Sequence, residues 1–208
     1  MNLPVDHLIY AAPTLESGMD KIEALLGVRP VYGGQHPGFG THNALLALGP
    51  DSYLEVIAPD PGQPNAPRPL WIPVDRLTQP RLIRWVAKSN DLSKLVQMAQ
   101  RNGLELGQVL EGSRTKPGGE LLRWRLTDPR VDPAGGIIPF FIDWGDTPHP
   151  ARALPQGGVL LSLSAGHPAA GKVQAQLLGI GLDLSIKAEQ TASLVAIIQT
   201  PAGIVELQ

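Results

Sequence analysis

Three side chains of this sequence combine acid–base or metal-binding chemistry with a strand-like setting. His7 lies in the apolar run LPVDHLIYAA, Glu55 in YLEVIA, and Glu206 in GIVEL, two residues before the last. An imidazole and two carboxylates can transfer protons or hold a hard or borderline divalent ion. Each also has a structural alternative. His7 could be a buried histidine bonded to backbone, Glu55 a solvent-facing residue of a half-buried strand, and Glu206 a charge on an edge strand.

A second group of residues could contact a small-molecule ligand. His42 and Asn43 follow the glycine-rich turn GGQHPGFG, whose glycines would let backbone approach a ligand closely. Arg84 could supply a cation for a carboxylate or phosphate, or could stack on the neighbouring Trp85 at the surface. The other three histidines, His36, His149 and His167, are expected at the surface.

Aromatic side chains could form the wall of a ligand pocket. Tyr53, Trp85 and Phe141 could stack around a planar molecule, with affinity that comes from burial. The alternative is that the aromatic residues around Phe141 mainly belong to the hydrophobic core.

Composition narrows the class of protein. The chain has 208 residues, no cysteine, and 17 basic against 19 acidic residues. The absence of cysteine excludes thiol catalysis and disulfide scaffolds, and together with the lack of a signal-peptide pattern it favours the cytoplasm. Scattered basic residues and the lack of a long apolar run predict no nucleic-acid partner and no membrane span. GGQHPGFG lacks the lysine and the Ser or Thr of a phosphate loop, so no nucleotide cofactor is expected.

One order of elements, β-α-β-β-β, is predicted three times. In the first copy Thr14 caps a helix at 15–26 with apolar residues at helical spacing, and Gly27 ends it. The predicted division is a first unit at 1–60, a proline-rich connector at 61–80, a second unit at 81–150 with a strand at Ile137–Trp144, and a shorter third unit at 157–208. Such units must cover each other's apolar faces.

The motifs VDHLIY, GTHN, YLEVI, PFFIDW and TPAGIVEL resemble the glyoxalase-like group of the vicinal oxygen chelate superfamily. This resemblance implies an α+β fold in which β-α-β-β-β units form an open, cup-shaped mixed sheet with helices outside. Strands of the cup present ligands from alternate positions to one divalent ion, which acts as a Lewis acid on a substrate with adjacent oxygens.

Carried onto this chain, the resemblance implies metal ligands at His7, Glu55 and Glu206, with Glu55 or Glu206 doubling as a base. Zn, Mn, Fe, Ni or Mg would suit such donors. The second unit departs from the pattern, because Arg84 or Trp85 and Phe140 or Phe141 stand where its ligands would be.

Two functions therefore remain open from the sequence. One is a lyase, isomerase or dioxygenase that acts on a small oxygenated metabolite, with substrate contacts from His42, Asn43, Tyr53, Arg84, Trp85 and Phe141. The other is a metal-free protein that binds and sequesters a small molecule. A structural or regulatory role without a ligand pocket is the third alternative, and it would show as a filled cup. Units of this kind pair two by two, so one of three units is left without a partner. We therefore also predict a homodimer that covers the apolar face of this unpaired unit.

Overall fold

The computed structural model describes residues 4–68, 70–115, 119 and 121–208. The order β-α-β-β-β occurs three times in this part of the chain. The first copy has β1 (Val5–Ala11), α1 (Leu15–Leu26), β2 (Val31–His36), β3 (Thr41–Ala47) and β4 (Tyr53–Pro59). The second has β5 (Arg81–Lys88), α2 (Leu92–Arg101), β6 (Val109–Thr115), β7 (Leu121–Thr127) and β8 (Phe140–Asp143).

The third copy has β9 (Val159–His167), α3 (Ala170–Gly179), β10 (Ser185–Ala188), β11 (Ser193–Thr200) and β12 (Gly203–Leu207). Two short 3-10 helices lie in the connections, η1 (Pro73–Arg76) between the first two copies and η2 (Pro150–Ala153) before the third. None of the helices in the described part of the chain is long and apolar enough to cross a membrane.

Local capping fixes the ends of the first helix. The side chain of Thr14 accepts a hydrogen bond from the backbone N–H of Ser17, which satisfies one of the free donors of the first turn. Gly27 takes a left-handed conformation (φ 77°) and returns its N–H to the carbonyl of Glu23. The helix that Thr14 and Gly27 predicted is therefore confirmed.

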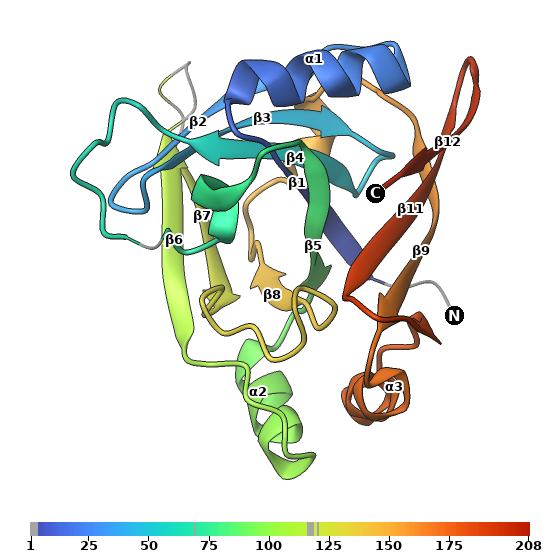
Figure 1. The fold of residues 1–208 in the computed structure, drawn as a ribbon. Helices are drawn as coiled ribbons and strands as arrows, with labels where there is room; N and C mark the ends of the chain where they lie inside the picture. Colours follow the sequence, from blue (N-terminus) through green and yellow to red (C-terminus); the bar gives the residue numbers. More distant parts are fainter. Residues whose placement is uncertain (1–3, 69, 116–118, 120) are drawn as a thin grey trace.

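The first two copies share one sheet of eight strands in the order β2-β3-β4-β1-β5-β8-β7-β6. The sheet curls until its edge strands β2 and β6 lie close to each other, with α1 and α2 outside (Figure 1). The predicted α+β cup is thus confirmed. β1 is buried along its whole length, with Leu8 and Tyr10 in the main core and Ile9 in a second apolar cluster. The alternation of the strand puts His7 on the same face as Ile9.

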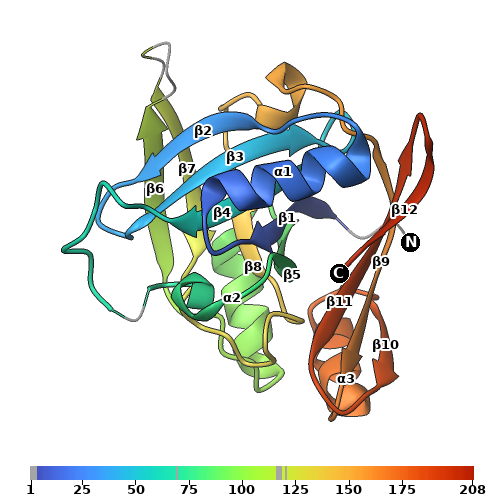
Figure 2. The ribbon, with the colours of Figure 1, turned by 45° about the horizontal axis from the view of Figure 1, so that its top comes forward.

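The third copy forms a separate sheet in the order β10-β9-β11-β12, beside the curled sheet (Figure 2). Leu163, Ala196 and Ile198 of this sheet belong to the same core cluster as Trp85 of β5. The opposite face carries exposed apolar side chains, namely Val159 (51%), Leu161 (54%) and Ile204 (67%).

The strand predicted at Ile137–Trp144 is shorter in the structure. Only Phe140–Asp143 forms β8, because the preceding residues form a turn with Gly135 and Gly136 at φ 59° and 89°. Pro139 then has no N–H to donate to a ladder. The last strand of the second copy consequently begins at Phe140.

Candidate active site

The curled sheet encloses a cavity of about 350 Å³. Its wall comes from β1, β2, β3 and β4 of the first copy and from β6, β7 and β8 of the second, so both halves of the barrel-like sheet contribute. The polar lining residues are His7, His36, Asn43, Tyr53, Glu55, Glu111, Ser113 and Arg114. Most other lining residues are apolar or aromatic, which suits a small organic ligand.

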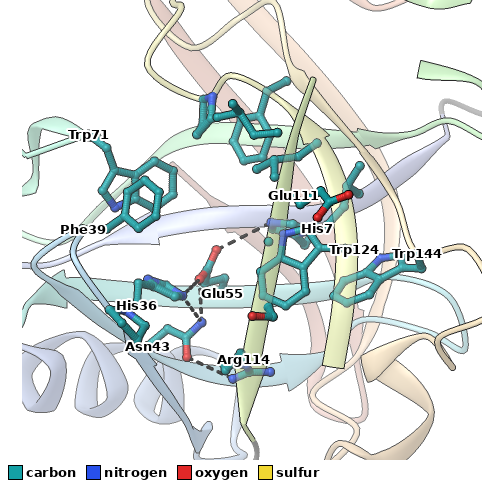
Figure 3. Close-up of a pocket in the computed structure, with 18 of the residues that line it drawn as sticks. His7, His36, Phe39, Asn43, Glu55, Trp71, Glu111, Arg114, Trp124 and Trp144 are labelled. Carbon is teal, nitrogen blue, oxygen red and sulfur yellow. Dashed lines mark hydrogen bonds and ion pairs between the residues drawn. The ribbon is translucent and has the colours of Figure 1, made fainter. Parts of the chain in front are cut away.

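The carboxylate of Glu55 is the centre of the polar group (Figure 3). It is buried, and the side-chain nitrogen of Asn43 donates a hydrogen bond of 2.6 Å to its Oε1. The Nε2 atom of His7 lies 3.6 Å from Oε2, and the Nε2 atom of His36 lies 3.6 Å from Oε1. One carboxylate is therefore oriented by an amide and flanked by two imidazoles.

A fully buried carboxylate, Asp6, fixes the ring of His7. Asp6 Oδ1 lies 2.7 Å from His7 Nδ1, while its Oδ2 accepts from Trp144 Nε1 at 3.0 Å and lies 3.2 Å from His149 Nε2. Burial raises the pKa of Asp6, but the hydrogen bonds from His149 and His7 outweigh it and hold this pKa far below its usual value. Because the ionised carboxylate only accepts, His7 carries its proton on Nδ1 and turns Nε2 toward Glu55.

His36 is oriented by the residues around Thr41. Its Nδ1 lies 2.8 Å from Thr41 Oγ1, which also accepts from Trp71 Nε1 at 3.0 Å. Asn43 Nδ2 is 3.2 Å from His36 Nε2, so the amide can donate one hydrogen to Glu55 and the other to His36. Burial lowers the pKa of His36, although the charge of Glu55 opposes this, so the neutral ring is favoured at pH 7.

Arg114 on β6 reaches the same network from the other edge of the sheet. It is buried, and its Nη1 donates to Asn43 Oδ1 at 3.3 Å, across the space between β6 and β3. Gly33 makes this approach possible, since a Cβ at that position would lie 2.5 Å from Arg114 Nη1 and 2.3 Å from Asn43 Oδ1. The side chains thus form a continuous row from Arg114 through Asn43 to Glu55 (Figure 3).

Six of the ten aromatic residues in the sequence line this one cavity. They are Phe39, Tyr53, Trp71, Trp124, Phe140 and Trp144. The ring of Tyr53 stacks on His7 with centroids 4.5 Å apart. Burial raises the pKa of Tyr53 well above its usual value, and the charges of Asp6 and Glu55 add to this effect. Its phenol therefore stays protonated and remains a hydrogen-bond donor.

The structure brings together some of the residues that the sequence singled out. His7, Asn43, Tyr53 and Glu55 all line the cavity, on three neighbouring strands of the first copy. Glu206 does not join them: it is exposed on β12 in the other sheet, where it accepts from the side chain of Gln208.

Four further candidates lie outside the cavity lining. His42 points away from it, because alternation on β3 puts His42 on the opposite face from Asn43, near Tyr32. Arg84 is buried against Asp132 at 2.8 Å and also donates to the carbonyl of Pro129. The other two, Trp85 and Phe141, belong to the main core.

Phe140 takes the place in the cavity wall that the sequence suggested for Phe141. Neighbouring residues of a strand face opposite sides, so the register of β8 against β5, which pairs Phe140 with Val86 and Phe141 with Ala87, decides which ring enters the core. The backbone N–H of Phe141 donates to the hydroxyl of Thr127, and its ring packs in the main core. Phe140 is thereby turned to the cavity.

Sequence reasoning missed His36, His149, Asp6 and Arg114. The signal for His36 was present: if GGQHPGFG joins two antiparallel strands, His36 pairs with Thr41 and shares its face with Asn43, as the register shows. Arg114 had no such signal, because its partner Asn43 lies 71 residues away on a strand that the sequence does not connect with β6.

The side chains present do not complete the metal site that the resemblance implied. Of its three donors only His7 and Glu55 are together, and Phe140 of the second copy has no donor atom. His36 is near, but an amide hydrogen of Asn43 points at its Nε2 and another at Glu55 Oε1. Within residues 4–208, apart from the undescribed positions, no three His, Cys, Asp or Glu side chains are arranged to hold a metal ion.

Comparison with known proteins identifies relatives of this fold. A family model described as "Glyoxalase-like domain" matches residues 5–181. A hypothetical protein from Staphylococcus aureus has a TM-score of 0.69 at 13% identity, over 100% of this chain and 99% of its own. A mutant of 4-hydroxymandelate synthase from Streptomyces coelicolor has a TM-score of 0.52 at 12% identity, over 99% of this chain and 62% of its own.

A more partial likeness is to methylmalonyl-CoA epimerase from Mycobacterium tuberculosis, with a TM-score of 0.46 at 18% identity, over 68% of this chain and 88% of that one. No curated protein matches the sequence. At these identities the likeness to solved structures concerns the fold.

Proposed function

The chain belongs to the glyoxalase-like domain family, and on that premise we propose that its cavity binds a small oxygenated metabolite and catalyses proton transfer at a carbon next to a carbonyl. Glu55 is the base. The observation that carries this proposal is a single buried carboxylate at the cavity wall, oriented by Asn43 and flanked at 3.6 Å by two histidines.

Glu55 has a free oxygen for the proton that leaves carbon. Oε1 accepts the hydrogen bond from Asn43 Nδ2, while Oε2 faces His7 at a distance too long for a hydrogen bond. In the step, the C–H bond breaks, the proton goes to Oε2, and the electron pair forms a C=C bond as the carbonyl oxygen becomes an enolate. The neighbouring Nε2 of His7 can then take that proton from Glu55, since Asp6 stabilises the imidazolium that results.

The enolate oxygen needs hydrogen-bond donors, and the cavity supplies two. The phenol of Tyr53 stays protonated because its pKa is raised, and Arg114 carries a permanent positive charge. Donors that are fixed before the reaction stabilise developing charge at no cost of reorganisation. The base and the donors thus line one cavity, and the proposed proton transfer uses only these side chains.

The test is deuterium exchange in D₂O, followed by proton NMR, with a panel of small ketones and 2-oxo acids. We expect the chain to accelerate loss of the proton next to the carbonyl for at least one compound. Glu55→Gln should lower that rate by at least about 100-fold, the lower range for loss of general base catalysis. Glu206→Gln is the matched control, because Glu206 is exposed on the second sheet, and it should leave the rate unchanged.

Equal rates for Glu55→Gln and for the unaltered chain would overturn the proposal. Exchange that disappears when a chelator is added would assign the chemistry to a bound metal ion instead. Both variants should be compared with the unaltered chain by circular dichroism, so that loss of folding is not taken for loss of the base.

The aromatic wall favours a second candidate, metal-free binding and sequestration of a planar molecule. Six aromatic rings line a cavity of about 350 Å³, and their faces and edges can hold a planar ligand by burial alone. Tight binding of a compound, followed by quenching of tryptophan fluorescence and without any exchange or turnover, would support sequestration. Turnover that depends on Glu55 would support the enzyme.

A further inference from the structure

Among the described residues that line the cavity, one carries a fixed positive charge, and this suggests what the substrate carries. Arg114 is buried and lines the cavity, with Nη1 at 3.3 Å from Asn43 Oδ1. A guanidinium has five donors in a rigid fork that matches a carboxylate. A neutral carboxamide oxygen at 3.3 Å engages one of these donors at moderate strength.

The spacing between the cation and the base is set by a single side chain. Asn43 receives the hydrogen bond from Arg114 on its Oδ1 and donates to Glu55 from its Nδ2. The guanidinium of Arg114 is therefore separated from the Glu55 carboxylate by one carboxamide group and its two hydrogen bonds, of 3.3 Å and 2.6 Å. In a 2-oxo acid, one carbonyl carbon separates the carboxylate from C3, the carbon that loses the proton.

The aromatic rings that line the cavity form two groups, one beside His36 and one beside His149. Trp71 lies beside His36, with Phe39 and Phe140 at 5.8 Å and 6.4 Å. Trp144 lies beside His149 and tilts against Trp124 at 5.4 Å. Either group can take a ring attached to the carbon near Glu55, because stacked and edge-on contacts between rings are both favourable.

We propose that the substrate is a 2-oxo acid with an aromatic ring on C3, bound by its carboxylate to Arg114. This inference rests on the proposed function of Glu55. The C3–H bond breaks, its proton goes to Glu55, and the electron pair forms the C2=C3 bond while the C2 carbonyl becomes an enolate. Return of a proton to the oxygen gives the enol, and return to C3 gives the exchanged keto acid, so no oxidant or other reactant is needed.

The test uses three probes in D₂O: phenylpyruvate, phenylacetone, which has the ring and ketone without the carboxylate, and pyruvate, which lacks the ring. After subtraction of the uncatalysed rate, we expect kcat/KM for exchange to be at least about 100-fold higher for phenylpyruvate than for either other probe. Arg114→Gln should lower the value for phenylpyruvate at least about 10-fold more than the value for phenylacetone, because both enolates lose a donor but only phenylpyruvate also loses the partner of its carboxylate.

Arg84→Gln is the matched control, because Arg84 is also a buried arginine but is paired with Asp132 outside the cavity lining. It should lower stability without changing the preference among the three probes. If Arg114→Gln does not fold, Arg114→Lys keeps the charge and loses the fork, and it should still reduce the preference for phenylpyruvate.

The outcomes separate this inference from the function on which it rests. Exchange that depends on Glu55 but is equally fast for phenylacetone and phenylpyruvate would overturn the assigned substrate class and leave the base in place. Exchange that prefers pyruvate would refute the role of the aromatic wall. If Glu55→Gln changes none of the three rates, both the proposed function and this inference are wrong.

Discussion

Asp6 holds the tautomer of His7, and the substitution Asp6→Asn should therefore change both stability and chemistry. An amide oxygen in place of Oδ2 can still accept from Trp144 and His149. The amide nitrogen would take the place of Oδ1, where it meets the Nδ1 proton of His7. His7 must then move its proton to Nε2, which directs an N–H at Glu55 and removes the free lone pair.

The size of the effect follows from the three hydrogen bonds. In the unaltered chain each of them is accepted by the charged, fully buried carboxylate of Asp6. Such bonds contribute about 1.5–3 kcal/mol to stability, against about 1 kcal/mol for a bond between neutral groups. Loss of the charge should thus lower the free energy of unfolding by about 3 kcal/mol. With a typical slope of about 2 kcal/mol per molar urea, the midpoint should shift down by about 1.5 M.

The assay is urea unfolding followed by tryptophan fluorescence, together with ¹⁵N NMR of the histidine rings. Asp60→Asn is the control, because Asp60 is also buried but accepts from the side chains of Gln63 and Gln35 and the backbone of Gly62, far from His7. Asp60→Asn should also lower stability, because it too removes a charged acceptor, but it should leave the His7 spectrum unchanged. A midpoint for Asp6→Asn within 0.3 M (roughly 0.5 kcal/mol) of the unaltered chain, with His7 still protonated on Nδ1, would refute the reasoning.

Four further outcomes are expected. Gly33→Ala should push Arg114 and its partner aside and destabilise the chain by about 1–3 kcal/mol, whereas Gly171→Ala, with open space around it, should be neutral in the same unfolding assay. Burial lowers the pKa of His36, so below about pH 6.5 the unfolded chain binds a proton at this ring more readily than the folded chain does. The free energy of unfolding should therefore fall from pH 7 to pH 5, and it should fall less steeply in His36→Gln. Calorimetric titration with ZnCl₂ should give the same heats for the chain and for His7→Ala, and stoichiometric binding lost in that variant would contradict the incomplete donor set. Light scattering should show twice 22.2 kDa, and Leu161→Glu on the exposed face of the second sheet should return the mass to 22.2 kDa; a monomer before substitution would disprove the predicted homodimer.

Local patterns in the sequence determined the fold class and one side of the site. The helix between Thr14 and Gly27 follows from a cap, an apolar period and a left-handed stop, all of them short-range effects. His7, Asn43 and Glu55 lie on strands whose alternation gives each a defined face, and the register of β1, β3 and β4 puts these faces together.

Only the tertiary structure decided which face is the cavity and which residues from distant strands meet there. Alternation says that Phe140 and Phe141 face opposite sides, but the register of β8 against β5 decides which ring enters the core. Arg114 joins Asn43 because the sheet curls until β6 comes near β2, which no local pattern encodes. Glu206 stays outside because its hairpin belongs to a separate sheet, and strand pairing over long separations depends on the packing of the whole core.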